Sequence, residues 1–165
     1  MIYLESLEAI LPRWEGEGKD GWAGKCEICY SNFLKGIQHP NSLHCHKLGI
    51  PYSAIKDLTK ALEILKKILD EIPNTTYKYM TFQGVIKPFT NGVIILYFES
   101  EKDMLTFISK FKELGKEVLK DPNNIESIFY RFIVNTDRID TAFYYRRGCP
   151  EYDLKFGSWR KWPKL

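Results

Sequence analysis

The side chains best suited to binding a metal ion gather between Lys25 and Lys47. This stretch holds three of the four cysteines and all three histidines, namely Cys26, Cys29, His39, His44, Cys45 and His46. A Cys-x2-Cys pair can present two thiolates to one tetrahedral zinc ion, and the other ligands commonly come from a second element further along the chain. The spacing therefore predicts one structural Zn²⁺.

Two sets of zinc ligands fit this spacing. If residues 42–50 form a strand, the side chains of His44 and His46 point to one face and that of Cys45 to the other. The first set then consists of Cys26, Cys29, His44 and His46. In the second set Cys45 joins the two N-terminal cysteines, with His39 or Cys149 as the fourth ligand. A catalytic metal, or cysteines without a metal, are the other interpretations of the cluster.

Cationic and aromatic side chains are concentrated towards the C-terminus. Every arginine except Arg13 lies after residue 130, interleaved with tyrosine, phenylalanine and tryptophan. Aromatic rings stack on bases and guanidinium groups hold phosphates, so this pattern is typical of single-stranded nucleic-acid binding. The residues expected to contact nucleic acid carry a ring or a positive charge: Tyr77, Tyr79, Arg131, Tyr145, Arg146, Arg147, Trp159, Arg160, Lys161 and Trp162.

A second short pattern suggests catalysis. The sequence His44-Cys45-His46 is followed by Tyr52-Ser-Ala-Ile-Lys56. This combination resembles the two-histidine metal motif and the Tyr-x3-Lys motif of HUH-type replication initiators and relaxases. The resemblance implies that His44 and His46 bind a divalent metal, that Tyr52 attacks a phosphate and that Lys56 assists electrostatically. Cys45 departs from the bulkier apolar residue that those enzymes normally carry between the histidines.

Hydrophobic periodicity indicates the elements that position these residues. Apolar residues at helical spacing predict a short helix over residues 3–12 and longer amphipathic helices over residues 53–72 and 100–118. Alternating patterns, with a hairpin turn at Asn91-Gly92, predict strands over residues 42–50, 77–87, 93–99, 128–135 and 141–147.

From residue 42 the expected order is strand, helix, strand, strand, helix, strand, with one extra strand. This is the split βαβ, or ferredoxin-like, order, and it is similar to that of RNA-recognition-motif folds. We therefore expect an α+β protein with an antiparallel sheet and two helices on one face. Residues 1–41 form an N-terminal helix and zinc-knuckle extension, residues 42–150 the ferredoxin-like core, and residues 151–165 a basic aromatic tail. The other sheet face is either open to nucleic acid or covered by the N-terminal segment or a second subunit.

Composition and charge limit the classes of protein to which the chain can belong. The chain has 165 residues, 44% of them apolar, and a net charge of +3. No apolar run approaches the length of a membrane span, and the N-terminus lacks a signal-peptide layout, so we expect a cytoplasmic protein without a membrane partner. The abundance of lysine, glutamate and isoleucine is compatible with a thermophile.

These observations predict a zinc-stabilised module that binds single-stranded RNA or DNA through its sheet face and tail. We do not expect an enzyme. One alternative is a non-catalytic subunit of a larger replication, transcription or RNA-processing assembly, because aromatic and arginine surfaces also bind proteins, including a second copy of the chain. A metal-dependent, HUH-like nuclease is the further alternative.

Overall fold

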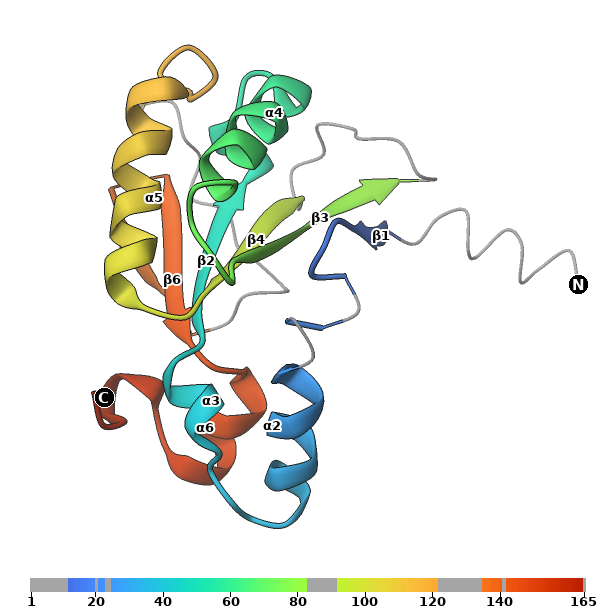
Figure 1. The fold of residues 1–165 in the computed structure, drawn as a ribbon, viewed down its shortest axis with the longest axis vertical. Coiled ribbons are helices and arrows are strands. Elements are labelled where there is room, and N and C mark those ends of the chain that lie inside the picture. Colours follow the sequence, from blue (N-terminus) through green and yellow to red (C-terminus); the bar gives the residue numbers. More distant parts are fainter. Residues whose placement is uncertain are drawn as a thin grey trace, which may run out of the picture.

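An antiparallel sheet of six strands lies at the centre of the protein (Figure 1). The computed structural model describes residues 12–19, 21–22, 25–82, 92–121, 135–140 and 142–164. The strands are β1 (Pro12–Glu15), β2 (His46–Pro51), β3 (Thr76–Phe82), β4 (Val93–Phe98), β5 (Asp137–Ile139) and β6 (Phe143–Arg147). They are arranged in the order β1-β3-β4-β2-β6-β5, and all neighbours are antiparallel. The predicted α+β class with an antiparallel sheet is confirmed, and the sheet is larger than that of a ferredoxin-like fold.

The helices begin where the sequence supplies N-caps. The described α-helices are α2 (Lys25–Leu34), α3 (Pro40–Leu43), α4 (Leu58–Leu69), α5 (Glu101–Leu114) and α6 (Pro150–Phe156), and the 3-10 helices are η1 (Tyr52–Ala54) and η3 (Trp159–Lys161). The carboxylate of Asp57 accepts a hydrogen bond from the Lys60 amide at 3.1 Å, and the Ser100 hydroxyl accepts one from the Asp103 amide at 3.1 Å. Each cap satisfies an amide that the first helical turn leaves without a partner.

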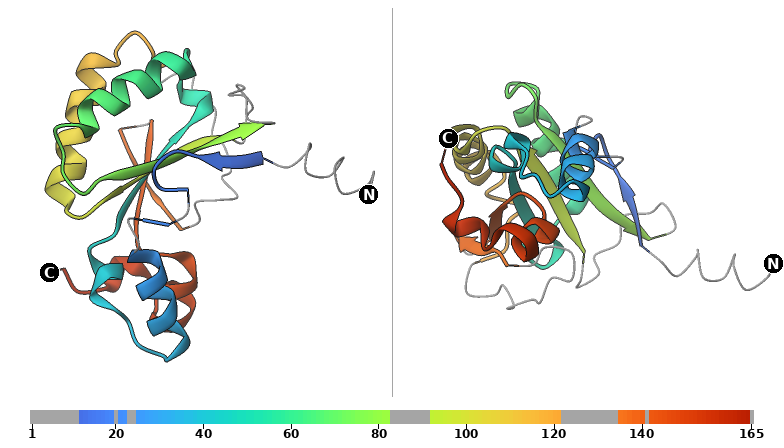
Figure 2. Two further views of the ribbon diagram at one scale, coloured as in Figure 1. Left: turned by 45° about the vertical axis from the view of Figure 1, so that its right-hand side comes forward. Right: turned by 90° about the horizontal axis from the view of Figure 1, so that it is seen from below.

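Helices α4 and α5 lie side by side on one face of the sheet (Figures 1 and 2). The ring of Phe107 lies 5.5 Å from that of Phe98 on β4, and the ring of Phe111 lies 6.2 Å from that of Phe143 on β6. All four side chains are buried. The main hydrophobic core is therefore the layer between these two helices and the central strands.

The opposite sheet face is covered by the N-terminal segment. Trp22 is 1% exposed and stacks on Tyr97 of β4, with 6.5 Å between the ring centroids. The Gly18 amide donates to the Tyr77 carbonyl at 2.7 Å, which holds the loop after β1 on β3. Of the two arrangements expected for this face, the structure has the one in which the N-terminal segment packs on it.

A second, smaller layer lies beyond one end of the sheet, where α2, α3, α6 and η3 gather (Figure 1). Its core is formed by Cys29, Tyr152, Trp159 and Trp162. The Tyr152 hydroxyl donates to the Cys29 carbonyl, which joins α6 to α2. The C-terminal residues, expected to form a tail with little regular structure, are thus folded into α6 and η3.

Several predicted elements differ in detail or fall outside the described residues. The predicted helix over residues 3–12 and almost all of the predicted strand over residues 128–135 lie outside them. Strand β1 was not predicted, and the Cys26/Cys29 pair, expected in a knuckle, lies in the first two turns of helix α2. Within the described ranges, no helix is long and apolar enough to cross a membrane.

Candidate functional site

A cleft of about 350 Å³ opens where the start of α5, the end of β6 and the C-terminal segment meet. Its walls carry side chains from elements far apart in the sequence, among them His44, His46, Glu101, Tyr145, Arg160 and Lys164. The antiparallel register places His46 opposite Arg147 and Leu48 opposite Tyr145, so β2 and β6 present His46 and Tyr145 on one face of the sheet. This is the same face that α5 covers further along the strands.

His46 and Tyr145 form a stacked, hydrogen-bonded pair in the cleft. The Nδ1 atom of His46 lies 2.8 Å from the Tyr145 hydroxyl, and the two rings are nearly parallel at 5.9 Å. Burial, followed by the positive charges of Arg147 and His44, lowers the pKa of His46 to about 4. Burial, with Glu101 close by, raises the pKa of Tyr145 to about 12. Both groups are therefore neutral at physiological pH.

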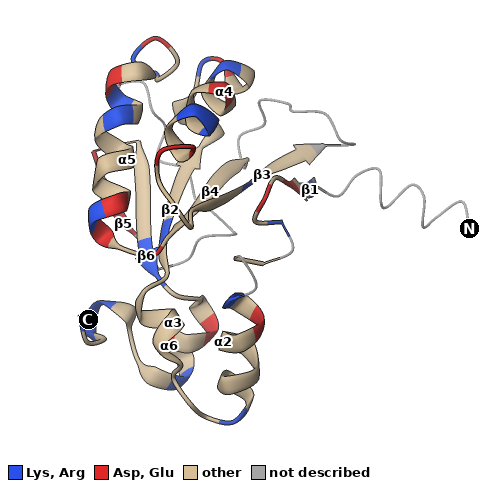
Figure 3. Cartoon of the chain, in the orientation of Figure 1, with Lys and Arg blue, Asp and Glu red and all other residues tan. Residues whose placement is uncertain are grey.

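The charged side chains of the cleft include one well-ordered ion pair. The Arg160 Nε atom donates to Asp137 at 2.8 Å, and its Nη1 atom donates to the side-chain carbonyl of Asn135. The same guanidinium lies over the ring of Trp159, 4.8 Å from the centroid. Lys161 and Lys164 follow in the same segment and are exposed. Figure 3 shows the positive residues of this C-terminal end beside the sheet.

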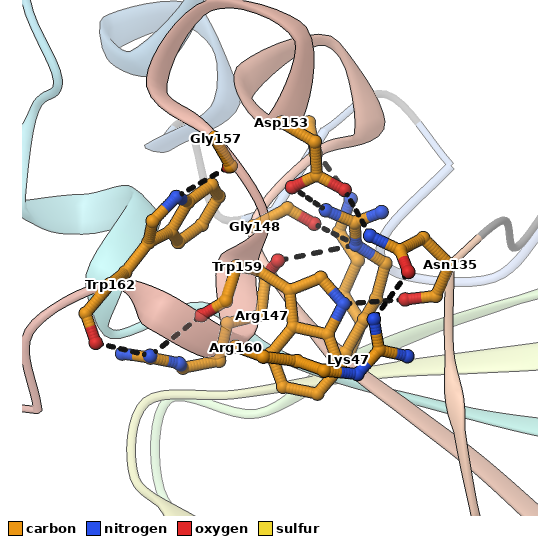
Figure 4. A network of polar contacts seen from close by, with 11 residues as sticks. Lys47, Asn135, Arg147, Gly148, Asp153, Gly157, Trp159, Arg160 and Trp162 are labelled. Carbon is orange, nitrogen blue, oxygen red and sulfur yellow. Dashed lines mark hydrogen bonds and ion pairs between the residues drawn. The ribbon is translucent and has the colours of Figure 1, made fainter.

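Arg146 and Arg147, predicted to bind nucleic acid, are buried instead. They are 1% and 4% exposed. Arg146 donates through Nε to the Gly148 carbonyl at 3.1 Å and through Nη2 to Asp153 at 2.8 Å. Arg147 donates at 2.8 Å to each of three carbonyls, those of Trp159, Trp162 and Pro163 (Figure 4). Both guanidinium groups are thus engaged by groups within the protein, namely backbone carbonyls and, for Arg146, the Asp153 carboxylate.

The two tryptophans expected in an exposed tail are also buried. Trp159 is 4% exposed and meets Tyr145 edge-on at 5.3 Å, and Trp162 is 5% exposed and packs on Tyr152. The Trp162 indole N–H donates to the Gly157 carbonyl at 2.9 Å (Figure 4). They anchor the C-terminal segment, and of the two only Trp159 lines the cleft.

Two of the other predicted contact residues, Tyr77 and Tyr79, lie away from the cleft. Tyr77 is 5% exposed, and Tyr79 is partly buried and stacks on it at 6.2 Å. Both belong to β3, on the far side of β4 from β2 and the cleft. Arg131 lies outside the described residues. Of the predicted nucleic-acid residues, the cleft lining therefore includes Tyr145, Arg147, Trp159 and Arg160, and Lys161 follows Arg160 in the chain.

The predicted metal ligands divide into two groups. His44, exposed, and His46 line the cleft. Cys45, between them, is 4% exposed and its backbone carbonyl accepts from the Gly148 amide at 2.9 Å, next to Cys149. His39 caps α3, where its Nδ1 accepts from the Asn41 amide. As they stand, no three His, Cys, Asp or Glu side chains within the described ranges are close enough together to hold a metal ion.

The predicted nucleophile is separated from the two histidines. His46 is the first residue of β2 and Tyr52 follows its last residue, so the rise of the strand places them roughly 20 Å apart. Tyr52 is 3% exposed and its hydroxyl donates to the Met80 carbonyl. Lys56 is exposed near the start of α4. The structure therefore does not assemble the HUH-like set of His44, His46, Tyr52 and Lys56.

Six residues that line the cleft were not among the predicted site residues, namely Leu43, Glu99, Ser100, Glu101, Asp137 and Lys164. Glu101 opens α5, and Lys164 lies next to the C-terminus. The basic composition of the tail was the available signal for Lys164. Nothing in the local pattern marks Glu101, because an acidic residue in the first turn of a helix is common for helix stability alone.

Comparison with protein-family models, with curated proteins and with solved structures finds no match for this chain. The function is therefore argued from the geometry of the cleft and of its surroundings.

Proposed function

We propose that the protein binds single-stranded nucleic acid, RNA or DNA, in the cleft beside its C-terminal segment. One observation carries the proposal: Arg160 lies over the ring of Trp159 in the wall of the same cleft in which Tyr145 stacks on His46. A concave surface that combines aromatic rings with positive charges suits an unstacked base and its phosphate.

Each part of the cleft has a distinct role in this proposal. The Tyr145 ring offers a stacking surface, and stacking contributes about 1–3 kcal/mol per base. Arg160, Lys161 and Lys164 attract the phosphates on either side of that base. The carboxylate of Glu101 accepts hydrogen bonds from base amino groups, as acidic side chains do from cytosine. The volume of about 350 Å³ suits one nucleotide rather than a duplex.

The strand order supports a ferredoxin-like unit within the larger sheet. The four strands β6-β2-β4-β3 are adjacent in that order, and helices α4 and α5 follow β2 and β4 in the chain. This is the arrangement of a split βαβ unit, to which β1 and β5 add one strand at each edge. In this interpretation the cleft lies at one end of the unit, where β2, β6 and the start of α5 meet.

The experiment that tests the proposal is a fluorescence-anisotropy titration of labelled single-stranded RNA and DNA over a range of salt concentrations. We expect binding at low salt that weakens with added salt, because phosphate contacts release counterions. The double variant Lys161→Ala/Lys164→Ala should reduce affinity at least tenfold and lower the salt slope by about two, or about one per lost phosphate contact. Tyr145→Leu should weaken binding without changing that slope.

A matched control is Lys66→Ala/Lys67→Ala, which removes the same charge from exposed positions on α4, away from the cleft. It should leave affinity within about twofold, since exposed charges more than a Debye length from the ligand are screened. Absence of binding at low salt, or equal losses in both double variants, contradicts the proposed site.

A second candidate function is that of a non-catalytic subunit of a larger assembly. The observation that favours it is the apolar outer surface of α2, where Tyr30 and Leu34, one turn apart, are 63% and 64% exposed. Exposed apolar side chains in one place commonly mark protein interfaces. If this is the function, the protein should elute with a larger complex from an extract of its own cells, and Tyr30→Ser/Leu34→Ser should release it while leaving nucleic-acid binding intact.

A further inference from the structure

The four cysteines of the chain converge on one region, although they come from three separate segments. Cys26 and Cys29 lie one turn apart in α2, Cys45 precedes β2, and Cys149 precedes α6. The Gly148 amide donates to the Cys45 carbonyl at 2.9 Å, which brings the second and third segments together. The Tyr152 hydroxyl donates to the Cys29 carbonyl, which brings the first and third together.

The pKa shifts of two of these thiols also indicate that the cysteine side chains lie near one another. Burial raises the pKa of Cys45 to about 12, and Cys149, Cys26 and Cys29 add to the rise while Lys47 opposes it. Burial likewise raises the pKa of Cys29 to about 11, with contributions from Cys149 and Cys26. Besides burial, the causes of these two shifts are the other cysteines, Lys47 and, for Cys29, Tyr152. The side chains of the four cysteines therefore lie near one another.

Two lysines border this group without a carboxylate partner. Lys47 donates to the Cys149 sulfur at 3.2 Å, and Lys78 lies over the Trp14 ring at 4.2 Å. Both ammonium groups also approach the ring of Tyr97, at 5.7 and 5.9 Å. Among the described residues neither lysine forms an ion pair with an aspartate or glutamate, and burial lowers the pKa of Lys78. Partly buried cations require a nearby negative charge, and the sulfurs are the groups placed to supply it.

We propose that Cys26, Cys29, Cys45 and Cys149 together bind one Zn²⁺ as four thiolates. Binding forms four Zn–S bonds and releases four thiol protons to solvent, with no change of oxidation state. The resulting centre carries a net charge of about −2, which Lys47 and Lys78 offset. Metal binding requires the four side chains to move closer together than they lie here, because no three of them are now close enough to hold a metal ion. The Trp22 amide, 3.1 Å from the Cys26 sulfur, remains as an N–H···S donor.

Such a site would connect helix α2 to the sheet and to α6, which is followed by the C-terminal segment. Its role is structural, because four protein ligands leave no coordination position for water. The proposal assigns the histidines no part in the site, which separates it from the alternative ligand set of Cys26, Cys29, His44 and His46. It does not depend on nucleic-acid binding.

The first test is elemental analysis of protein purified under reducing conditions without chelators, together with X-ray absorption spectroscopy at the zinc edge. We expect about one zinc per chain, surrounded by four sulfurs at about 2.3 Å. A first shell containing nitrogen at about 2.0–2.1 Å overturns the proposed ligand set. A metal-free protein that still takes up no zinc on reconstitution overturns the site itself.

Variants give an independent test. Cys149→Ser should lower zinc content at least fivefold, whereas His44→Ala and His39→Ala, at exposed or partly exposed positions, should leave it unchanged. Because Cys149→Ser can also impair folding, the spectroscopic measurement on the unaltered protein stands by itself. Zinc loss in His44→Ala equal to that in Cys149→Ser contradicts the inference.

Discussion

Arg147, the last residue of β6, donates a hydrogen bond to the main-chain carbonyl of Trp162 at 2.8 Å. The same guanidinium group donates to the carbonyls of Trp159 and Pro163. One buried cation thus donates to the carbonyl of the first residue of η3 and to those of the two residues that follow this helix. The C-terminal segment is held on the sheet by this side chain and by the burial of two tryptophans.

Replacing Arg147 should therefore detach the C-terminal segment. We expect Arg147→Ala to lower the free energy of unfolding by about 3 kcal/mol, because the carbonyls of Trp159 and Trp162 lose a charged donor and the Trp159 carbonyl keeps only the Trp162 amide. Urea denaturation measures this loss, and a red shift of tryptophan emission before the main transition should report exposure of the two indoles. Lys161→Ala, an exposed cation in the same segment, is the control and should change stability by less than about 0.5 kcal/mol.

The roles of these arginines could not be predicted from the sequence. Arginine is rarely buried, so Arg146 and Arg147 beside tyrosines indicated an exposed, cationic surface. Their partners are backbone carbonyls and, for Arg146, the Asp153 carboxylate, and the chain brings these groups close through turns at Gly148, with φ 62°, and at Gly157, with φ 82°. Only the folded path of the chain places those carbonyls around the guanidinium groups.

The ion pair between Arg146 and Asp153 should show strong coupling in a double-mutant cycle. Arg146 is 1% exposed and its Nη2 atom lies 2.8 Å from the Asp153 carboxylate. Arg146→Met leaves that carboxylate without its cation and should lower the free energy of unfolding by about 3–5 kcal/mol. Adding Asp153→Asn should recover part of this loss. Strictly additive effects of the two substitutions, measured by urea denaturation, would show that the pair contributes nothing specific.

Local sequence patterns correctly predicted several of the amphipathic helices and strands. Helices α4 and α5 and the β3–β4 pair were expected close to their observed positions, because their apolar residues recur at regular spacing. Strand β1 was missed because it lies beside a glycine-rich stretch and pairs only with β3, far along the chain. The predicted strand over residues 42–50 was wrong in its first part, because residues 40–43 form α3 and the strand begins only at His46. The approach of Cys149 to Cys45 depends on the β2–β6 register, which the sequence pattern does not reveal.

We predict that the packing of Trp22 on the sheet face opposite α4 and α5 contributes strongly to stability. It is 1% exposed, and within the described part of the chain its indole N–H has no hydrogen-bond partner. Trp22→Ala should lower the free energy of unfolding by about 3–5 kcal/mol, since a large cavity opens over Tyr97. Trp22→Phe keeps a ring there and removes the unpaired N–H, so it should cost less than about 1.5 kcal/mol. Equal losses in the two variants, compared by urea denaturation, would contradict a packing role.

Substitution of Tyr52 tests whether this residue has a structural role or the catalytic role implied by the HUH-like pattern. Its hydroxyl donates to the Met80 carbonyl, and burial raises its pKa, so the phenolate needed for attack does not form readily. Tyr52→Phe removes this one hydrogen bond and should lower the free energy of unfolding by about 1 kcal/mol. We also expect single-stranded DNA, incubated with Mg²⁺ or Mn²⁺, to remain uncut and free of covalently bound protein in both the unaltered protein and the variant. A protein–DNA adduct on a denaturing gel that is present with Tyr52 and absent with phenylalanine would establish Tyr52 as a nucleophile and require β2 to rearrange around it.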